Sequence, residues 1–83
     1  MEEKTIFKYM IISRVGTCKR TLIYGVYTLK YVTLGKIFWC NSWRQYCFYP
    51  DSGIQFNHSC LSDISEFLKE LNKEHRNKNK EEK

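Results

Sequence analysis

The chain has 83 residues, of which 42% are hydrophobic and 16% aromatic, and it carries a formal net charge of +5. This length allows one compact domain and excludes a multi-domain enzyme with a large cleft between lobes. The hydrophobic content is high enough for a real core, which argues against a chain that is disordered throughout. No apolar run approaches the roughly 18 residues that a membrane span needs, and no signal peptide is recognisable. We therefore expect a cytoplasmic protein, in a compartment that keeps its cysteines reduced.

The positive charge is concentrated in one part of the chain. Between Lys4 and Pro50 there are eight Lys and Arg residues and no Asp or Glu. Such a one-sided stretch favours an anionic partner, either nucleic acid or an acidic protein surface. The alternative is a β-rich region that takes its solvent-facing residues from Lys and Arg. The eight cations are Lys4, Lys8, Arg14, Lys19, Arg20, Lys30, Lys36 and Arg44.

The residues before Pro50 have the β-branched and aromatic composition of strands. Three or four antiparallel strands are expected, and Pro50 should end the last of them. Gly25 lies inside the second segment and suggests a bulge or a twist point. The expected strand segments are residues 5–15, 20–28, 32–41 and 45–49. The expected turns are residues 16–19, 42–44 and 51–53.

A C-terminal helix is the clearest element of the sequence. Ser59 is its expected N-cap, and the helix should fade near His75. Residues 76–83 are all polar and should form a disordered tail after a single domain of residues 1–75. One apolar stripe with helical spacing defines the buried side of the helix. Its members are Leu61, Ile64, Phe67, Leu68 and Leu71.

These elements predict an α+β fold, in which a three- to four-stranded antiparallel sheet packs against one C-terminal helix. A single amphipathic helix covers only one face of such a sheet. The other face, or an edge of the sheet, is then free to meet a partner.

Signatures of enzymes are scarce in this chain. There is no glycine-rich phosphate loop, no His-Glu-x-x-His and no Gly-x-Ser-x-Gly motif. The two histidines are His58 and His75, and only His58 lies near a thiol, that of Cys60 at the expected start of the helix. A thiol enzyme is the weakest of the functions considered, and we expect a protein that is not an enzyme.

The four cysteines allow a structural zinc site. Cys40 and Cys47 flank the expected hairpin turn, and a four-residue turn would make them face each other, whereas His58 and Cys60 lie at the expected start of the helix. Together they would supply a Cys₃His set, which closes a tetrahedral zinc site. Cys18 is an alternative ligand for one of the four positions. The competing interpretations are that these thiols pair as disulfides or pack as small apolar side chains.

Aromatic residues are interleaved with the cations. Eleven of the 13 aromatic residues lie in residues 7–49. Aromatic rings beside Lys and Arg stack on unpaired bases, but Trp, Tyr and Arg are also the usual anchors of protein interfaces. Ordinary packing within a sheet is the third explanation. The residues expected to contact a partner are Trp43 and Arg44 at the hairpin turn, with Trp39 and Lys36 nearby.

Residues 37–68 carry a recognisable pattern, Trp-Arg-x-Tyr-x-Phe-x-Pro followed by Cys-Leu-x-x-Ile-x-x-Phe. It resembles small proteins encoded by phages and prophages. In this chain the pattern comprises Trp43, Arg44, Tyr46, Phe48, Pro50, Cys60, Leu61, Ile64 and Phe67.

Small phage proteins of this kind often act against host defences. The resemblance therefore implies a non-enzymatic inhibitor in the host bacterial cell, and it makes an anti-CRISPR protein acting on the Cas9 effector the most concrete possibility. Many such inhibitors are acidic mimics of DNA, and the positive charge of this chain departs from that pattern. We therefore expect contact with an acidic patch of a host protein. The alternative is a small basic nucleic-acid-binding module that uses an aromatic face of the sheet.

Overall fold

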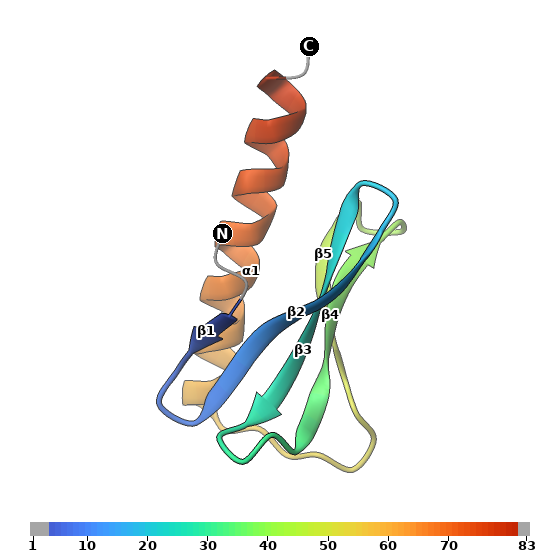
Figure 1. Ribbon diagram of the computed structural model, residues 1–83. Coiled ribbons are helices and arrows are strands. Elements are labelled where there is room, and N and C mark those ends of the chain that lie inside the picture. The colour runs from blue at the N-terminus through green and yellow to red at the C-terminus, as the bar shows by residue number, and fades with distance from the viewer. Residues whose placement is uncertain (1–3, 82–83) are drawn as a thin grey trace.

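The computed structural model describes residues 4–81, with side chains for residues 4–77, and shows a five-stranded antiparallel sheet with one helix (Figure 1). The strands follow one another in space in the order β1-β2-β3-β4-β5. The α+β class and the antiparallel sheet are as expected, but the sheet has five strands rather than three or four. The elements are β1 (Lys4–Ile6), β2 (Met10–Cys18), β3 (Thr21–Thr28), β4 (Thr33–Cys40), β5 (Gln45–Pro50) and α1 (His58–Glu81).

The additional strand arises because the expected strand over residues 5–15 is folded into a hairpin. The amide of Phe7 donates a hydrogen bond to the carbonyl of Met10 at 2.7 Å, and Lys4 pairs with Ser13 across the ladder. The connecting residues include no Gly, Pro, Asn or Asp, which are the residues that usually announce a turn. Sequence composition alone therefore gives no sign of this turn.

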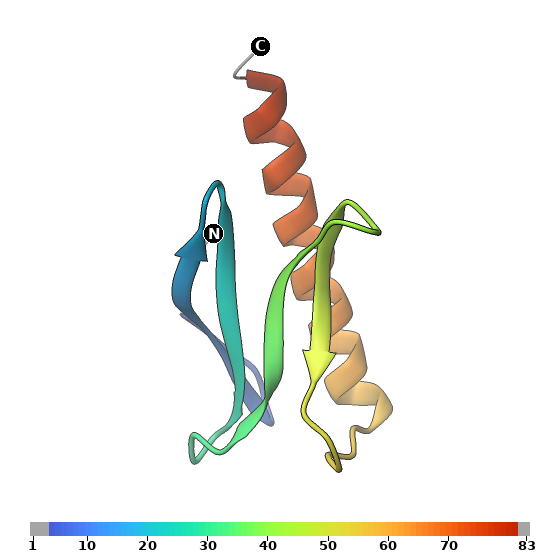
Figure 2. The same cartoon turned by 90° about the vertical axis from the view of Figure 1, so that its right-hand side faces the viewer.

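One face of the sheet forms the core with α1. The ring of Tyr24 packs edge-on against Phe67 of α1, with ring centroids 5.0 Å apart. Figures 1 and 2 show α1 lying along this face beside β5. The buried cluster is Met10, Ile12, Tyr24, Val26, Ile37, Tyr46, Ile64, Phe67 and Leu71.

The opposite face of the sheet, which α1 leaves bare, is called here the uncovered face. Side chains alternate between the two faces along a strand, so the neighbours of the core residues point to this side. On β3, β4 and β5 this face includes Ile23, Gly25, Tyr27, Lys36, Phe38, Cys40, Cys47 and Tyr49.

The helix begins earlier and ends later than the sequence predicts. Asn57, not Ser59, caps it, because the side-chain oxygen of Asn57 accepts a hydrogen bond from the amide of Cys60 at 2.9 Å. Within the apolar stripe, Leu61 is 49% exposed, whereas the other four members pack on the core.

Past His75 the helix continues to Glu81, so residues 76–81 of the expected tail are helical and residues 82–83 lie outside the described part. Lys, Arg and Glu are good helix formers, which explains why a polar segment continues the helix. Within residues 4–81, no helix is long and apolar enough to cross a membrane.

Two glycines differ from the turn and the bulge that the sequence suggests. Gly16 lies inside β2 at a bulge between Arg14 and Gly16, and the turn follows at Lys19, whose φ is 55°. Gly25 is not a bulge itself. A side chain there would collide with the ring of Tyr27, which lies over Gly25 on the uncovered face.

Candidate functional site: two hairpin tips and the cleft between them

The turn between β4 and β5 displays the two residues that the sequence singled out. It spans Asn41 to Arg44, and Cys40 pairs with Gln45 at its base. The side chain of Trp43 is 72% exposed, the largest exposed fraction among the apolar side chains described. Arg44 is also exposed and has a φ of 54°, in the left-handed region that favours Gly or Asn. The structure thus places a large aromatic ring and a guanidinium together at a tip.

The other two expected contact residues lie elsewhere. Trp39 points to the helix side, where its ring lies 5.4 Å from Tyr46 and 4.5 Å from His75. Lys36 is exposed on the uncovered face, opposite Tyr49 in the register of β4 and β5. The four residues therefore do not form one patch.

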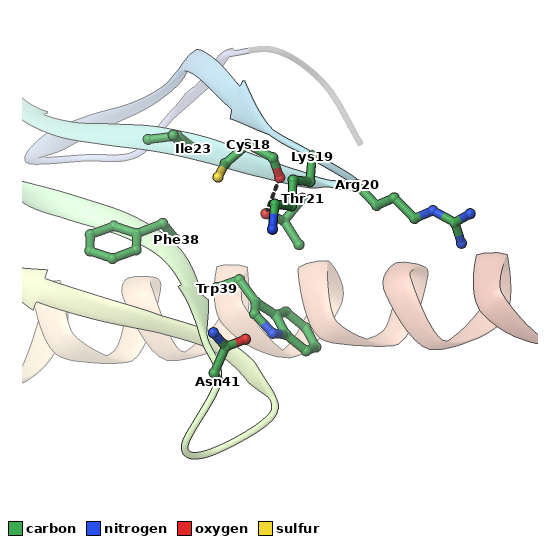
Figure 3. A pocket seen from close by; sticks show the side chains of 8 residues that line it. All are labelled: Cys18, Lys19, Arg20, Thr21, Ile23, Phe38, Trp39 and Asn41. Atoms are coloured by element: carbon green, nitrogen blue, oxygen red, sulfur yellow. Dashed lines mark hydrogen bonds between the residues drawn. The ribbon is translucent and has the colours of Figure 1, made fainter.

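A cleft separates the β4–β5 tip, residues 41–44, from the β2–β3 tip, residues 19–20. The β3–β4 ladder extends only from Tyr27↔Thr33 to Tyr24↔Ile37, so the ends of the two strands splay apart. The cleft has a volume of about 530 Å³. Figure 3 shows β3 side chains on one side of it and Phe38 and Trp39 of β4 on the other. Its lining residues are Cys18, Lys19, Arg20, Thr21, Ile23, Phe38, Trp39 and Asn41.

The lining of the cleft combines positive charge with aromatic surface. Lys19 and Arg20 come from the β2–β3 tip, and Phe38 and Trp39 come from β4. Arg20 also lines a second, smaller cavity, together with Glu74 and His75 of α1. Such a cleft suits an aromatic or apolar group that carries negative charge.

Two thiols and a phenol form a cluster on the uncovered face of the β4–β5 hairpin. Cys40 pairs with Gln45 and Cys47 with Phe38, so the two cysteines are diagonal neighbours and do not face each other directly as expected. The pKa of Cys40 is lowered, first because the hydroxyl of Tyr49 hydrogen-bonds to its sulfur and then because the amide of Trp43 does so.

The other two groups of this cluster shift in the opposite direction. Burial raises the pKa of Cys47. The hydrogen bond to Cys40 raises the pKa of Tyr49 to about 12, because the phenol must stay protonated to donate it. Cys40 is therefore the thiol of the pair that ionises first.

The structure does not gather the expected zinc ligands into one site. Cys40 and Cys47 lie on the uncovered face, whereas Cys60 packs against the core on the helix side and His58 is exposed at the first residue of α1. Across the described residues, no group of three or more His, Cys, Asp and Glu side chains is placed to hold a metal ion. All four cysteines are free, and Cys18 is exposed at the cleft. The zinc stays a prediction, which elemental analysis of the purified protein tests.

Sequence analysis missed the part that Lys19, Phe38 and Tyr49 play in these surfaces. The alternation of β4 offered a signal, since Lys36, Phe38 and Cys40 share one side of any strand that buries Ile37. The separation of β3 from β4 had no such signal.

Comparison with protein-family models, curated proteins and solved structures finds no match for this chain.

Proposed function

We propose that this chain is a non-enzymatic binding protein that inhibits a host defence protein by direct contact through the β4–β5 tip. The observation that carries the proposal is the pairing of Trp43 and Arg44 at an exposed turn. Leaving the indole in water forfeits the burial energy of a large apolar side chain. Holding a non-glycine residue in the left-handed region costs about 1–2 kcal/mol. Lys19 and Tyr31 adopt the same left-handed conformation in two other turns, so it is the exposed indole beside a guanidinium, and not the backbone conformation, that favours a role in binding.

The chemistry of the tip indicates the kind of surface that it would meet. Exposed Trp and Arg are the residues most enriched among the anchors of protein interfaces. Arg44 would pair with carboxylates in bidentate fashion, and the acid-free stretch from Lys4 to Pro50 would steer the protein towards negative potential. An acidic patch beside a pocket for the indole is therefore the partner surface that we propose.

The resemblance to small phage proteins makes Cas9 the first partner to test. With a net charge of +5, the chain is a poor mimic of DNA. Contact with an acidic patch away from the DNA channel is the mode of inhibition consistent with this charge.

The test compares the wild-type protein with a Trp43→Ala, Arg44→Ala double variant, in binding to guide-loaded Cas9 and in inhibition of DNA cleavage. Leu29→Ala is the matched control, because Leu29 is 50% exposed in the β3–β4 turn at the other end of the sheet. We expect the double variant to lose binding by about 100-fold or more, since anchors of this type each contribute about 2 kcal/mol or more. The control should bind like the wild type.

A second measurement separates the mode of contact from the identity of the partner. If wild-type protein does not bind Cas9, that candidate is wrong. Immobilised wild-type protein and double variant are then compared in a bacterial host lysate. Equal capture of the same proteins by both would overturn the proposal that the β4–β5 tip is the contact surface.

A further inference from the structure

The uncovered face of the sheet carries aromatic rings around a central lysine. The rings of Phe38 and Tyr49 lie parallel, with centroids 3.9 Å apart and an interplanar angle of 4°. Lys36 pairs in register with Tyr49 on β5 and with Gly25 on β3. Because the ring of Tyr27 lies over Gly25, Lys36 is flanked by an aromatic side chain on both neighbouring strands. Lys36 itself is exposed, and the three rings are half-buried.

The charge around these rings has one sign. No Asp or Glu occurs between Lys4 and Pro50, so the only Lys, Arg, Asp or Glu side chains on strands β1 to β5 are the positively charged Lys and Arg. The carboxylates whose side chains are described begin at Asp51 and then belong to α1, which lies against the other face. An anionic ligand on the uncovered face would therefore meet no nearby strand carboxylate.

The uncovered face is continuous with the cleft. Phe38 belongs to both, since it stacks on Tyr49 and also lines the cleft. Lys19 stands at the far rim of the cleft, at the end of β2. A path across the sheet thus passes from Lys36 over the Phe38 and Tyr49 rings into the cleft and reaches a second cation at Lys19.

We propose that the uncovered face binds single-stranded nucleic acid, with bases stacked on Phe38, Tyr49 and Tyr27 and with phosphates neutralised by Lys36 and Lys19. Every base offers a π-face to a ring, and basic side chains beside the rings follow the backbone, as in other single-strand binders. A duplex keeps its bases stacked on one another and cannot use such a platform. An acidic peptide would satisfy the lysines but supplies no regular series of planar groups for the rings. This proposal is independent of protein contact through the β4–β5 tip.

The first experiment measures fluorescence anisotropy of fluorescein-labelled oligo-dT and oligo-U of about 12 nucleotides, a length within the usual range for one small domain. A duplex of the same length and a titration with unlabelled poly-glutamate complete the set. We expect both single strands to bind more tightly than the duplex, and affinity to fall as salt rises. For single strands the logarithm of the affinity falls with a slope of about −0.7 for each phosphate neutralised.

Two substitutions test the roles of charge and rings. Lys36→Gln should weaken binding and reduce the steepness of the salt dependence by about one phosphate contact. Phe38→Leu keeps an apolar side chain in the sheet but removes the ring, and it should lower affinity by about fivefold or more. The matched control is Lys73→Gln, which removes one exposed charge from α1 and should have little effect on affinity. Should Phe38→Leu fail to fold, Lys36→Gln against Lys73→Gln carries the test.

Several results would overturn the inference. One is no binding of either oligonucleotide at about 100 mM salt, where non-specific binders still retain measurable affinity. Another is equal weakening by Lys36→Gln and Lys73→Gln, which would mean that the surface responds to net charge alone. A third is displacement of the labelled oligonucleotide by poly-glutamate as efficiently as by unlabelled oligo-dT, which would indicate that the surface binds an acidic protein. Trp43→Ala should leave oligonucleotide affinity unchanged, so the failure of one proposal is distinguishable from the failure of the other.

Discussion

The hydroxyl of Tyr46 accepts a hydrogen bond from the backbone amide of Leu22 at 3.0 Å, across the point where β3 and β4 separate. A strand that leaves its neighbour exposes an amide that a regular ladder would have satisfied. Tyr46 reaches this amide from β5, beneath the splayed strands, and is 3% exposed. The amide that the separation of β3 and β4 would leave unpaired is therefore hydrogen-bonded, and the cleft is an ordered part of the fold.

Tyr46→Phe tests this relationship. Removing the hydroxyl leaves the Leu22 amide without its partner, which should lower the free energy of unfolding by about 1–3 kcal/mol. In a domain of this size, each kcal/mol corresponds to a fall of about 4–8 °C in the melting temperature. Tyr31→Phe is the control, because Tyr31 is 55% exposed and should tolerate the change. Equal melting temperatures for the two variants would contradict the role given to Tyr46.

Asn72 joins the helix to the edge of the sheet. Its side-chain oxygen accepts a hydrogen bond from the amide of Tyr46 at 2.7 Å, and its side-chain nitrogen donates to the carbonyl of the same residue at 3.5 Å. Asn72→Leu should therefore destabilise the protein by about 1–3 kcal/mol and speed hydrogen exchange at the Tyr46 amide. Asn77→Leu, at an exposed position on the same helix, should do neither. Unchanged exchange at Tyr46 would show that the helix is held without this bond.

Arg44→Gly separates stability from binding at the β4–β5 tip. Glycine adopts a φ of 54° without the clash that an L side chain suffers, so unfolding in urea should show a gain of about 1 kcal/mol. The same change removes the guanidinium and should weaken capture of the protein partner. Gln45→Gly is the control, because Gln45 begins β5 and glycine there should cost about 0.5–1 kcal/mol. If Arg44→Gly is more stable and captures the partner as well as the wild type does, Arg44 does not belong to the contact surface.

Features that depend on local pattern could be predicted from the sequence. The buried residues Ile64, Phe67 and Leu71 follow the helical period, and Trp43 and Arg44 fall in a turn between two β-rich segments. In each case, neighbours in the chain decide the outcome.

Features that depend on contacts between distant segments could not be predicted in this way. The break between β1 and β2 has no turn residues, and Asn57 caps the helix although Ser59 has the same propensity. The cleft exists because β3 and β4 separate beyond Tyr24. The hydroxyl of Tyr46, 24 residues along the chain from Leu22, accepts the hydrogen bond of the Leu22 amide that β4 no longer satisfies. Such a feature has no signature in any short window of sequence.

The thiol of Cys40 should be more reactive than that of Cys47. Only the thiolate attacks an alkylating reagent, and hydrogen bonds from the Tyr49 hydroxyl and the Trp43 amide lower the pKa of Cys40, whereas burial raises that of Cys47. As pH rises, alkylation of Cys40 by iodoacetamide should therefore reach half its maximal rate before alkylation of Cys47 does. Mass spectrometry of the alkylated peptides follows the two sites separately.

Tyr49→Phe provides the decisive comparison for this cluster. Without the phenol, the pKa of Cys40 should rise, its alkylation profile should move to higher pH, and its rate near neutral pH should fall by about twofold or more. Tyr27→Phe removes a hydroxyl from the same face and should leave the profile in place, because Tyr27 is not among the groups that lower the Cys40 pKa. If Tyr49→Phe leaves the Cys40 profile where it was, the phenol does not stabilise the thiolate and the turn amides alone account for its ionisation.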